Sequence, residues 1–410
     1  MSTNPTRPKP QRNLSLKDSH AGCFRAPATH DAHVNRNGDT DKFQAKVGST
    51  GDGQIVTVID SGVVHSINHK NCQSSAEGYK QIVATLFYTT HTTNTTEEVA
   101  QYGRFISQAA LFDFISRWDK LMVPWRRWDS SHKCLERSEE ARVVQLVLLM
   151  PEMLSLEDLR RHEELAEYEA KWSIEIVLQP HNVFQRHKRL AVFDMDSTLI
   201  EQEVIDEIAR FVGVEKEVSA ITARAMNGEL DFTQSLQARV ALLKGVPSDV
   251  FEKLKPVITF TPGARELCKA LKSLGFKLAV LSGGFIPLAN HVMSELGLDY
   301  AYANQLVISE DGTELTGELT GPIVHAERKA LLLEEIAQKE SIHLKQTVAI
   351  GDGANDLIMM WKAGLGIAFN AKPKVQAEAP CRLNSPTLKD VLYILGFAKG
   401  EQDDLLALSP

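Results

Sequence analysis

Two aspartates separated by a single residue give the strongest chemical signal in the chain. Asp194 and Asp196 follow the short apolar run Leu190–Phe193. Ser197 and Thr198 come directly after them. Two carboxylates this close repel each other, so a metal ion or a shared proton is needed to hold them together. Calcium loops and ordinary turns also contain Asp-x-Asp pairs, but the apolar run before this one favours a site at the end of a buried strand.

A second acidic motif follows another apolar run. Residues 351–356 read GDGAND and come directly after Thr347–Ile350. The glycines permit a tight turn and a close approach of the backbone to a ligand. If the two runs are neighbouring strands, Asp352 lies beside Asp194 and Asp196 and offers the oxygen ligands that suit Mg²⁺. The glycine spacing excludes a dinucleotide-binding fingerprint, and the absence of Gly-Lys-Ser/Thr excludes a P-loop.

Two further features point to a phosphate. The apolar run Lys277–Leu281 ends in Ser282-Gly283-Gly284, and a hydroxyl with exposed N–H groups at a strand-to-helix turn can bind phosphate oxygens. Lys329 lies in a helix that we expect over Glu327–Gln338. A lysine on a helix is usually just solvated, so spacing alone does not assign it a role.

The elements that position these residues form an α/β pattern after residue 186. Short apolar strands without inside–outside alternation are separated by helices, which indicates a parallel sheet covered on both faces. In such sheets ligands bind at the carboxyl ends of the strands. The predicted strands are Leu190–Phe193, Lys277–Leu281, Thr347–Ile350 and Leu365–Phe369.

An insertion over about Glu203–Pro262 separates the first two strands, and we expect it to be helical throughout. Phe232, Leu236, Arg239 and Leu243 share one helix face by their spacing. Either this face belongs to a lid that meets a ligand, or Arg239 reaches solvent at the edge of an apolar stripe. The spacing leaves both alternatives open.

The N-terminal half predicts a different architecture. Residues 1–53 are polar and rich in Pro, Asn, Asp and Gly, which predicts disorder. Between 80 and 180 the pattern predicts the β-α-β-β-α-β order of a ferredoxin-like fold. The expected elements are strand Ile82–Tyr88, helix Glu97–Trp118, a weak strand within 119–130, strand Val143–Met150, a helix from Ser155 to about Ala170 and strand Ser173–Leu178. Residues 397–410 are expected to form a C-terminal tail.

Composition excludes several classes of protein. The 410 residues have a net charge of −8, which gives no overall basic footprint for nucleic acid. No apolar run approaches the roughly 20 residues of a membrane span, and no secretory signal is evident. The five cysteines are scattered, without zinc-ligand spacing, as expected for free thiols in a reducing compartment. The basic N-terminus resembles a transit peptide, but its prolines would break the required helix. We therefore expect a cytoplasmic protein.

Taken in order, the motifs resemble those of the haloacid dehalogenase superfamily. More narrowly, FDMDSTLIEQEVIDEI at 193–208, VLSGGF at 280–285 and AIGDGAND at 349–356 are similar to the phosphoserine phosphatase family. The resemblance covers about Leu190–Leu395, half of the chain. It implies a Rossmann-like core (187–202 and 263–396) with a helical cap (203–262). It also implies Mg²⁺-dependent hydrolysis of O-phospho-L-serine, the last step of L-serine biosynthesis.

The resemblance also implies a role for each matching position. Asp194 matches the nucleophile that becomes an aspartyl-phosphate, and Asp196 matches the general acid and base. The metal ligands would be the side chains of Asp194 and Asp352 and the backbone carbonyl of Asp196. Glu203 and Arg239 match the groups that bind the amino and carboxylate ends of the substrate. The remaining matches are the pocket walls Met226 and Phe232, the phosphate contacts Ser282, Gly283, Lys329 and Asn355, with Ser282 and Lys329 also counted as catalytic, and the supporting carboxylate Asp356.

Three alternative functions remain open, and two predictions concern binding partners. The same residues would serve a phosphotransferase or a phosphatase of another small phosphomonoester, and a non-catalytic amino-acid sensor is a more distant alternative. The region 80–180 is similar to the ACT domains that precede many phosphoserine phosphatases. A small-molecule substrate is expected, without nucleic acid or membrane, and the chain can pair into a homodimer.

Overall fold

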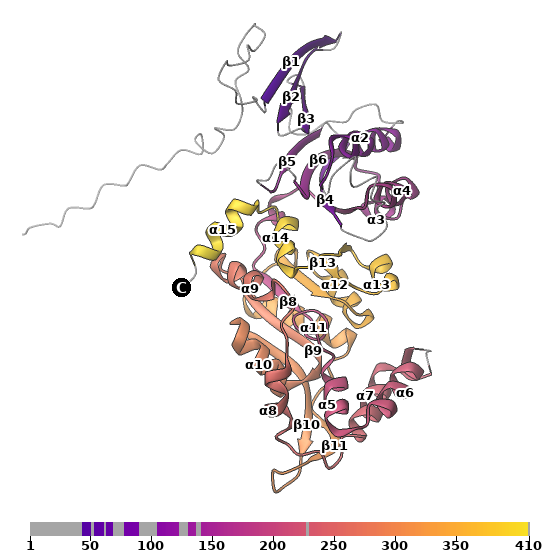
Figure 1. Ribbon diagram of the computed structural model, residues 1–410, viewed down its shortest axis with the longest axis vertical. Coiled ribbons are helices and arrows are strands. Elements are labelled where there is room, and N and C mark those ends of the chain that lie inside the picture. Colours follow the sequence, from indigo (N-terminus) through magenta and orange to yellow (C-terminus); the bar gives the residue numbers. More distant parts are fainter. Residues whose placement is uncertain are drawn as a thin grey trace, which may run out of the picture.

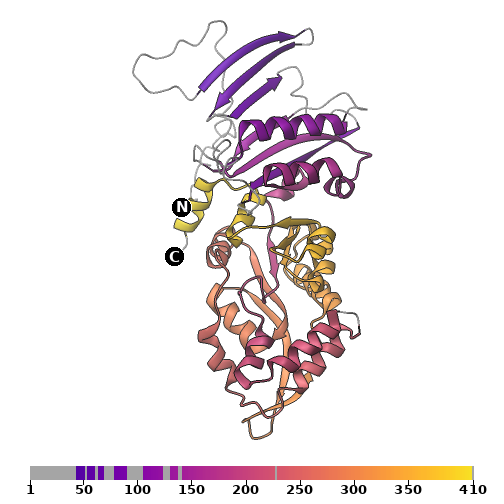
Figure 2. The same cartoon turned by 45° about the vertical axis from the view of Figure 1, so that its right-hand side comes forward.

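A computed structural model describes residues 43–50, 53–60, 63–68, 78–89, 105–122, 130–136, 141–226 and 229–408, the first three ranges as backbone only. The N-terminal elements lie at one end of the molecule, and the parallel sheet with its helices forms the other end (Figures 1 and 2). Within the described ranges, no helix combines the length and the apolar composition that crossing a bilayer requires.

The first three strands form an antiparallel sheet, β1-β2-β3. They are β1 (Phe43–Thr50), β2 (Gly53–Asp60) and β3 (Val63–Asn68). The predicted disorder of residues 1–53 is therefore wrong for 43–50. Composition up to residue 53 misses this strand because its pairing partner β2 begins only at Gly53 and continues through a run of β-branched residues that favours strands. Residues 1–42 lie outside the described part of the chain.

The next seven elements follow the predicted β-α-β-β-α-β order, with α3 and α4 standing for the second helix. Their sheet is antiparallel, in the order β5-β6-β4-β7. The elements are β4 (Tyr79–Tyr88), α2 (Gln108–Met122), β5 (Ser130–Cys134), β6 (Val143–Pro151), α3 (Leu156–Arg160), α4 (Glu163–Trp172) and β7 (Ile174–Pro180).

Predicted boundaries in this region differ from the structure. Helix α2 begins at Gln108, because the Ser107 hydroxyl accepts a hydrogen bond from Ala110 N and caps the helix there, and the predicted start at Glu97 lies outside the described residues. The second helix is broken, because His162 accepts a hydrogen bond from Glu164 N and starts a new helix. The weak strand expected within 119–130 is β5, which begins at residue 130, where it pairs with β6.

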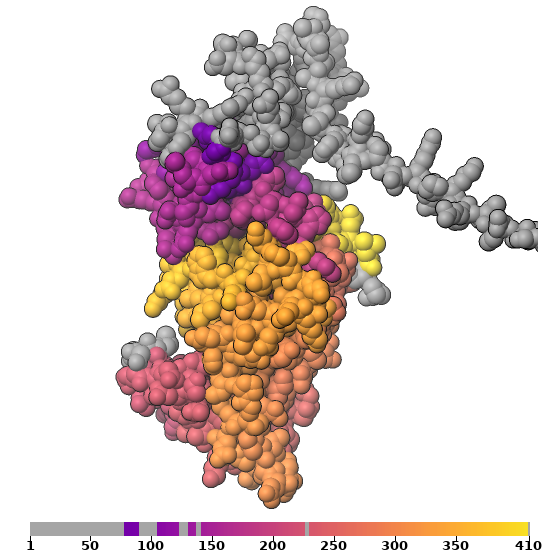
Figure 3. Space-filling model, turned by 180° about the vertical axis from the view of Figure 1, so that it is seen from behind, coloured from indigo at the N-terminus to yellow at the C-terminus, as the bar shows by residue number. Residues whose placement is uncertain are grey.

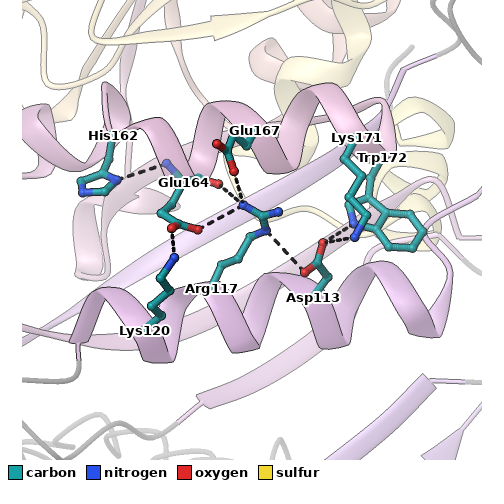
Figure 4. A network of polar contacts seen from close by, with 8 residues as sticks. All are labelled: Asp113, Arg117, Lys120, His162, Glu164, Glu167, Lys171 and Trp172. Atoms are coloured by element: carbon teal, nitrogen blue, oxygen red, sulfur yellow. Dashed lines mark hydrogen bonds and ion pairs between the residues drawn. The ribbon is translucent and has the colours of Figure 1, made fainter.

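Helices α2 and α4 cover one face of this sheet. Phe114, Trp118 and Tyr168 are fully buried between the helices and the strands. A polar network joins the two helices on their outer side (Figure 4). Its contacts are from Arg117 to Asp113, Glu164 and Glu167, from Lys120 to Glu164, and from Lys171 and Trp172 to Asp113.

The other face of the same sheet packs against the C-terminal half. Its apolar side chains join the large core cluster of that half, and the rings of Phe87 and Tyr393 meet edge to face at 6.4 Å. In Figure 3 the magenta N-terminal atoms lie directly against the yellow and orange C-terminal ones. The side chains contributed by the N-terminal sheet and the segment after β5 are Phe87, Leu135, Val143 and Val177.

A half-buried ionic cluster, in which only Glu175 is fully shielded from solvent, closes one side of this junction. Arg382 donates to Glu175 (3.1 Å) and to Glu169, both from the N-terminal region. The second oxygen of Glu175 accepts the backbone N–H of Asn384 (2.8 Å). We call Arg382, Glu169, Glu175 and Asn384 the junction cluster.

The C-terminal half contains a seven-stranded sheet in the order β11-β10-β9-β8-β12-β13-β14, parallel except for β11. This confirms the predicted α/β class. The short runs at β8, β12 and β13 were predicted, whereas β10, β11 and β14 were not. The strands are β8 (Leu190–Phe193), β9 (Lys277–Phe285), β10 (Tyr300–Ile308), β11 (Leu315–Thr320), β12 (Thr347–Gly351), β13 (Gly366–Phe369) and β14 (Cys381–Leu383).

Helices cover both faces of this sheet, which explains why its strands do not alternate in polarity. Ala191 and Phe193 of β8 face the cluster that includes α9 and α10, while Leu190 and Val192 face the cluster that includes α11 and α12. The helices of the core and the C-terminus are α9 (Ala264–Ser273), α10 (Ile286–Leu296), α11 (Ala326–Lys339), α12 (Leu357–Lys362), α13 (Pro373–Glu378), α14 (Val391–Ile394) and α15 (Lys399–Ala407). Helix α15 lies in the segment predicted only as a tail.

The cap contains α5 (Val204–Val212), α6 (Glu215–Met226), α7 (Phe232–Ala241) and α8 (Val250–Leu254). It is not helical throughout, because residues between α7 and α8 pair with the β10–β11 hairpin. Leu243 is buried but lies beyond the end of α7, so it does not share that helix with Arg239. Short 3-10 helices lie at Val183–Gln185, Lys255–Val257, Leu344–Gln346, Ala354–Asp356 and Leu388–Asp390.

Candidate active site

Asp194 lies at the carboxyl end of β8, near the middle of the sheet, with β9 on one side and β12 on the other. Its backbone N–H donates to Ile350 O (2.9 Å) and so continues the ladder with β12. Its Oδ1 atom accepts hydrogen bonds from Met195 N and from the ammonium of Lys329, each at 2.7 Å. The carboxylate is therefore buried and held in one orientation.

Lys329 reaches this edge of the sheet from α11 and is fully buried. Its ammonium lies 2.7 Å from Asp194 and 2.8 Å from Asp356. Burial alone would lower the pKa of Lys329, but the two carboxylates outweigh burial and raise it. A charged lysine beside Asp194 can bind a phosphate oxygen. Because Lys329 is fully buried, it is not the solvated helix lysine that spacing alone allowed.

Three carboxylates meet at this point. Oxygen atoms of Asp194, Asp352 and Asp356 lie within 4.8 Å of one another. Burial, followed by the charge of Asp194, raises the pKa of Asp352 to about 7 and that of Asp356 to about 8. Asp352 accepts a hydrogen bond from Thr198 (3.3 Å). Lys329 ion-pairs with the other two carboxylates, so a divalent cation with oxygen preference fits this site as the missing counter-charge.

Asp196 faces the same space with its carboxyl group. Oδ2 accepts a long hydrogen bond from Val204 N (3.3 Å), and the buried Oδ1 has no partner among the described residues. Burial raises the pKa of Asp196 well above its usual value, and the charges of Glu203 and Asp194 add to this. The protonated form is favoured, so Asp196 has the properties of a general acid.

Glu203 precedes α5 and is held at the rim of this space. The hydroxyl of Ser197, whose backbone is left-handed (φ 55°), donates to Glu203 Oε1 at 2.9 Å. Partial desolvation raises the pKa of Glu203, although the side chain still reaches solvent. The hydrogen bond from Ser197 counteracts this effect and favours the ionised form.

A bulge in β9, Ser282–Gly284, forms the opposite wall; the predicted strand end at Leu281 is wrong, because the strand resumes its pairing with β10 at Phe285. Ser282 is fully buried, and its Oγ accepts the N–H of Gly284 (2.8 Å), which leaves its own O–H free to donate. A Cβ on Gly284 would lie 3.2 Å from Met195 Cε and 3.4 Å from Asp196 Oδ2, so glycine leaves room for Asp196. The bulge thus presents a hydroxyl and backbone N–H groups toward the carboxylates.

Sequence reasoning missed Asn304, which holds this bulge. Its Nδ2 donates to Gly283 O (2.7 Å) and its Oδ1 accepts the N–H of Val324 (2.8 Å), so it links the bulge to the segment just before α11. Asn304 lies in β10, a strand that the sequence did not predict. A single polar residue in a sequence does not indicate a buried structural role unless the strand that contains it is already known to be buried.

The glycines of the GDGAND turn allow close packing around Asp356. A Cβ on Gly351 would overlap the Asp356 carboxyl group. Gly353 N donates to Asp356 Oδ2 (3.1 Å), and the side chain of Asn355 folds over Gly353. Asp356 is therefore fixed by Lys329 and by its own turn, in agreement with a supporting position.

The cap closes the site from α7. A Cβ on Gly283 would lie 3.2 Å from the ring of Phe232, so glycine lets this ring contact the bulge of β9. Arg239 is largely buried, and its Nε donates to Ser235 O (3.3 Å) in its own helix. It forms no ion pair with another described residue, although the charges of Asp206, Glu203 and Asp196 oppose the lowering of its pKa by burial. The side chain of Met226, predicted as a pocket wall, lies outside the described residues.

Comparisons with known proteins agree with this geometry. The family model of haloacid dehalogenase-like hydrolases matches residues 191–360. The chain is similar to the probable phosphoserine phosphatase of Schizosaccharomyces pombe, with 53% identity over 223 residues that cover 54% of this chain and 75% of the relative. It is 48% identical over 237 residues to the phosphoserine phosphatase of Archaeoglobus fulgidus, which covers 58% of this chain and 67% of that relative.

A solved structure extends the likeness to the N-terminal region. A crystallised HAD family hydrolase of Salmonella enterica serovar Typhi has a TM-score of 0.59 and 29% identity. It covers 77% of this chain and 98% of its own length, a share that exceeds the C-terminal half and so includes part of the N-terminal region.

Proposed function

The chain belongs to the phosphoserine phosphatase family of haloacid dehalogenase-like hydrolases, and on that basis we propose that it hydrolyses O-phospho-L-serine to L-serine and phosphate. The observation that supports this reaction most directly is the position of Lys329 between Asp194 and Asp356, with Asp352 completing the acidic group. A phosphate dianion repels a carboxylate nucleophile, and this arrangement supplies a buried positive charge at that point.

In the first step an oxygen of Asp194 attacks phosphorus. The bond from phosphorus to the serine oxygen breaks as the bond to Asp194 forms, which gives an aspartyl-phosphate. Asp196 donates its proton to the departing serine oxygen, since a serine alkoxide is a poor leaving group. In the second step Asp196 takes a proton from water, which attacks phosphorus and releases Asp194.

The residues present fit the magnesium ion that the sequence predicts. The carboxylates of Asp194 and Asp352 and the backbone carbonyl of Asp196 would hold it, and it would neutralise the charge of the phosphate when bound. Asp356 is engaged with Lys329 instead, so we assign it a supporting role.

Contacts to the rest of the substrate explain the preference for phosphoserine. Arg239 has no carboxylate partner within the described chain, and its planar guanidinium suits a substrate carboxylate. Glu203, held by Ser197, suits the ammonium group of the amino acid. Ser282, Gly283, Lys329 and Asn355 would bind phosphate oxygens. The cytoplasmic location, the homodimer and an amino-acid-binding role of residues 80–180 stay predictions.

Phosphate release by the full chain tests this proposal. The panel contains O-phospho-L-serine, p-nitrophenyl phosphate and other small phosphomonoesters, with Asp194→Asn as the variant. Asp194→Asn should abolish turnover and the trapped phospho-enzyme. The exposed Asp249→Asn, whose carboxylate pairs only with Lys253 at the surface, serves as the matched control and should remain active. Full turnover by Asp194→Asn, or no preference for phosphoserine in the unaltered protein, would overturn it.

A further inference from the structure

The segment that follows α7 is fastened to a hairpin of the core. Residues 245–248 of the cap pair with residues 313–315, next to the turn between β10 and β11. We call these two segments the clasp. The hairpin projects at the cap end of the molecule, beside the helices of the cap (Figures 1 and 2). The backbone hydrogen bonds of the clasp run from Gly245 N to Leu315 O (2.9 Å), from Leu315 N to Val246 O (2.8 Å) and from Ser248 N to Thr313 O (2.8 Å).

A bulge in β11 lies directly against the end of α7. Three residues of β11, 316–318, face the single residue Val307 of β10. The central one, Gly317, has a left-handed backbone (φ 79°), which glycine adopts without strain. A Cβ on Gly317 would lie 3.1 Å from Lys244 Cβ and 3.2 Å from Ala241 O. The absence of a side chain therefore lets the hairpin touch the last turn of α7.

The same helix turn contains Arg239, two residues before Ala241. The guanidinium of Arg239 donates a hydrogen bond to the backbone carbonyl of Ser235 in its own helix. It forms no ion pair with a carboxylate of the described residues. Its position in the site is therefore set by the position of α7. Leu236 and Val240 hold α7 against the core, and the contact of Gly317 with Ala241 holds the last turn from the hairpin side.

We propose that Gly317 and the clasp position Arg239 and thereby set the enzyme's selectivity for substrates that bear a carboxylate. Gly317 touches no substrate, so it is a positioning residue that acts through the backbone of α7. This inference rests on the proposed function, because Arg239 must contact the substrate carboxylate for its position to matter.

The substitution Gly317→Ala tests the proposal, with Gly321→Ala as the matched control. Gly321 follows β11 and has a similar left-handed backbone (φ 72°), but a Cβ there meets nothing within 4 Å. Both variants therefore share the backbone strain, and only Gly317→Ala presses on α7. Kinetics are measured on O-phospho-L-serine and on p-nitrophenyl phosphate, which lacks a carboxylate, and thermal melting shows that each variant is folded.

Gly317→Ala should raise KM for phosphoserine about three- to tenfold, because the neighbours of the new Cβ must shift, and a full 1 Å misplacement in a site costs about a hundredfold. Its kcat/KM for p-nitrophenyl phosphate should stay within about twofold, and Gly321→Ala should leave both substrates within that range. Equal losses on the two substrates, or the same loss in both glycine variants, would refute the positioning role.

A double variant separates this inference from the proposed function. In an Arg239→Ala background, Gly317→Ala should change phosphoserine kinetics by less than about twofold, since the positioned group is gone. Full additivity would contradict the inference while leaving the proposed function intact. If Arg239→Ala itself affects both substrates equally, the assignment of Arg239 to the carboxylate fails first.

A second variant covers the case in which Gly317→Ala does not fold. Ser248→Ala removes the hydrogen bond from Ser248 Oγ to Gly312 O (2.7 Å) at the tip of the clasp, without adding any atom. It should raise KM for phosphoserine in the same direction by a smaller factor and spare p-nitrophenyl phosphate. An unchanged KM in this variant would count against the clasp.

Discussion

The ammonium of Lys329 lies 2.7 Å from Oδ1 of Asp194, and both side chains are buried. One lysine thus orients the attacking carboxylate and prepares a positive charge for the phosphate that must approach it. The second partner of Lys329, Asp356, lies 2.8 Å from the ammonium and holds the lysine from its other side.

Replacing this lysine should damage both activity and stability. Lys329→Met should lower kcat about a hundred- to a thousandfold, in line with the loss of one charged donor at a transition state. It should also destabilise the protein by about 3–5 kcal/mol, because it leaves two buried carboxylates without their partner. Kinetics and chemical denaturation measure the two effects. Lys339→Met, on the exposed last turn of the same helix, is the control and should change neither.

Asp196→Asn should reveal general acid catalysis through its dependence on the leaving group. For phosphoserine, kcat/KM should fall about 10²–10⁴-fold, because the serine oxygen must leave with a proton. For p-nitrophenyl phosphate the loss should be much smaller, since p-nitrophenolate is a stable anion. Equal losses on both substrates would show that Asp196 is not the acid of the first step.

Removal of divalent cations should stop hydrolysis without unfolding the protein. EDTA followed by gel filtration should abolish phosphate release, and added Mg²⁺ should restore it. Asp352→Asn should raise the Mg²⁺ concentration needed for half-maximal rate, because one charged ligand is lost. Full activity in EDTA would show that the reaction needs no metal ion near Asp194, Asp352 and Asp356.

The junction cluster gives a prediction about stability and pH. Burial raises the pKa of Glu175 above the usual 4.5, although Asn384 and Arg382 act against this. The folded state therefore binds a proton more readily than the unfolded state. The resulting stabilisation is present below pH 4.5 and is lost as the pH rises through the folded pKa. Denaturation of Glu175→Gln should show a flatter dependence on pH in this window.

Arg382→Met is the contrasting variant at the same junction. It leaves Glu169 and Glu175 without their cation, so it should destabilise the protein by about 1–3 kcal/mol at neutral pH, less than at a fully buried pair because Arg382 is 33% exposed. Glu175→Gln, which resembles the protonated form, should cost far less. A milder effect from Arg382→Met than from Glu175→Gln would contradict this account of the cluster. Arg161→Met, at an exposed pair with Glu157, is the control.

The sequence predicted the parts of the fold in which chemistry and burial coincide. Strands β8 and β12 are short apolar runs that end in aspartates, so both the strand and the site residue could be read from one segment. Lys329 was harder, since only the folded chain shows that its helix face turns toward two carboxylates. The resemblance to a family supplied its role.

The remainder depends on contacts between distant segments. Strand β14 has three residues and is defined by its pairing with β13. The bulge at Gly317 and the clasp involve segments about 70 residues apart in the chain. The sequence of neither segment indicates that the other is its pairing partner. Asn304 is a further example, because its role is to join two distant segments by hydrogen bonds to Gly283 and Val324. Local patterns do not encode such pairings.

The packing of Phe87 against Tyr393 has a consequence for any shortened form of the chain. The C-terminal half shares part of its interior with the N-terminal sheet, so removing the N-terminal region would expose apolar side chains around Tyr393. It would also leave Arg382 without Glu169 and Glu175. A truncated enzyme that keeps the sequence of the C-terminal half should therefore aggregate more readily than the full chain.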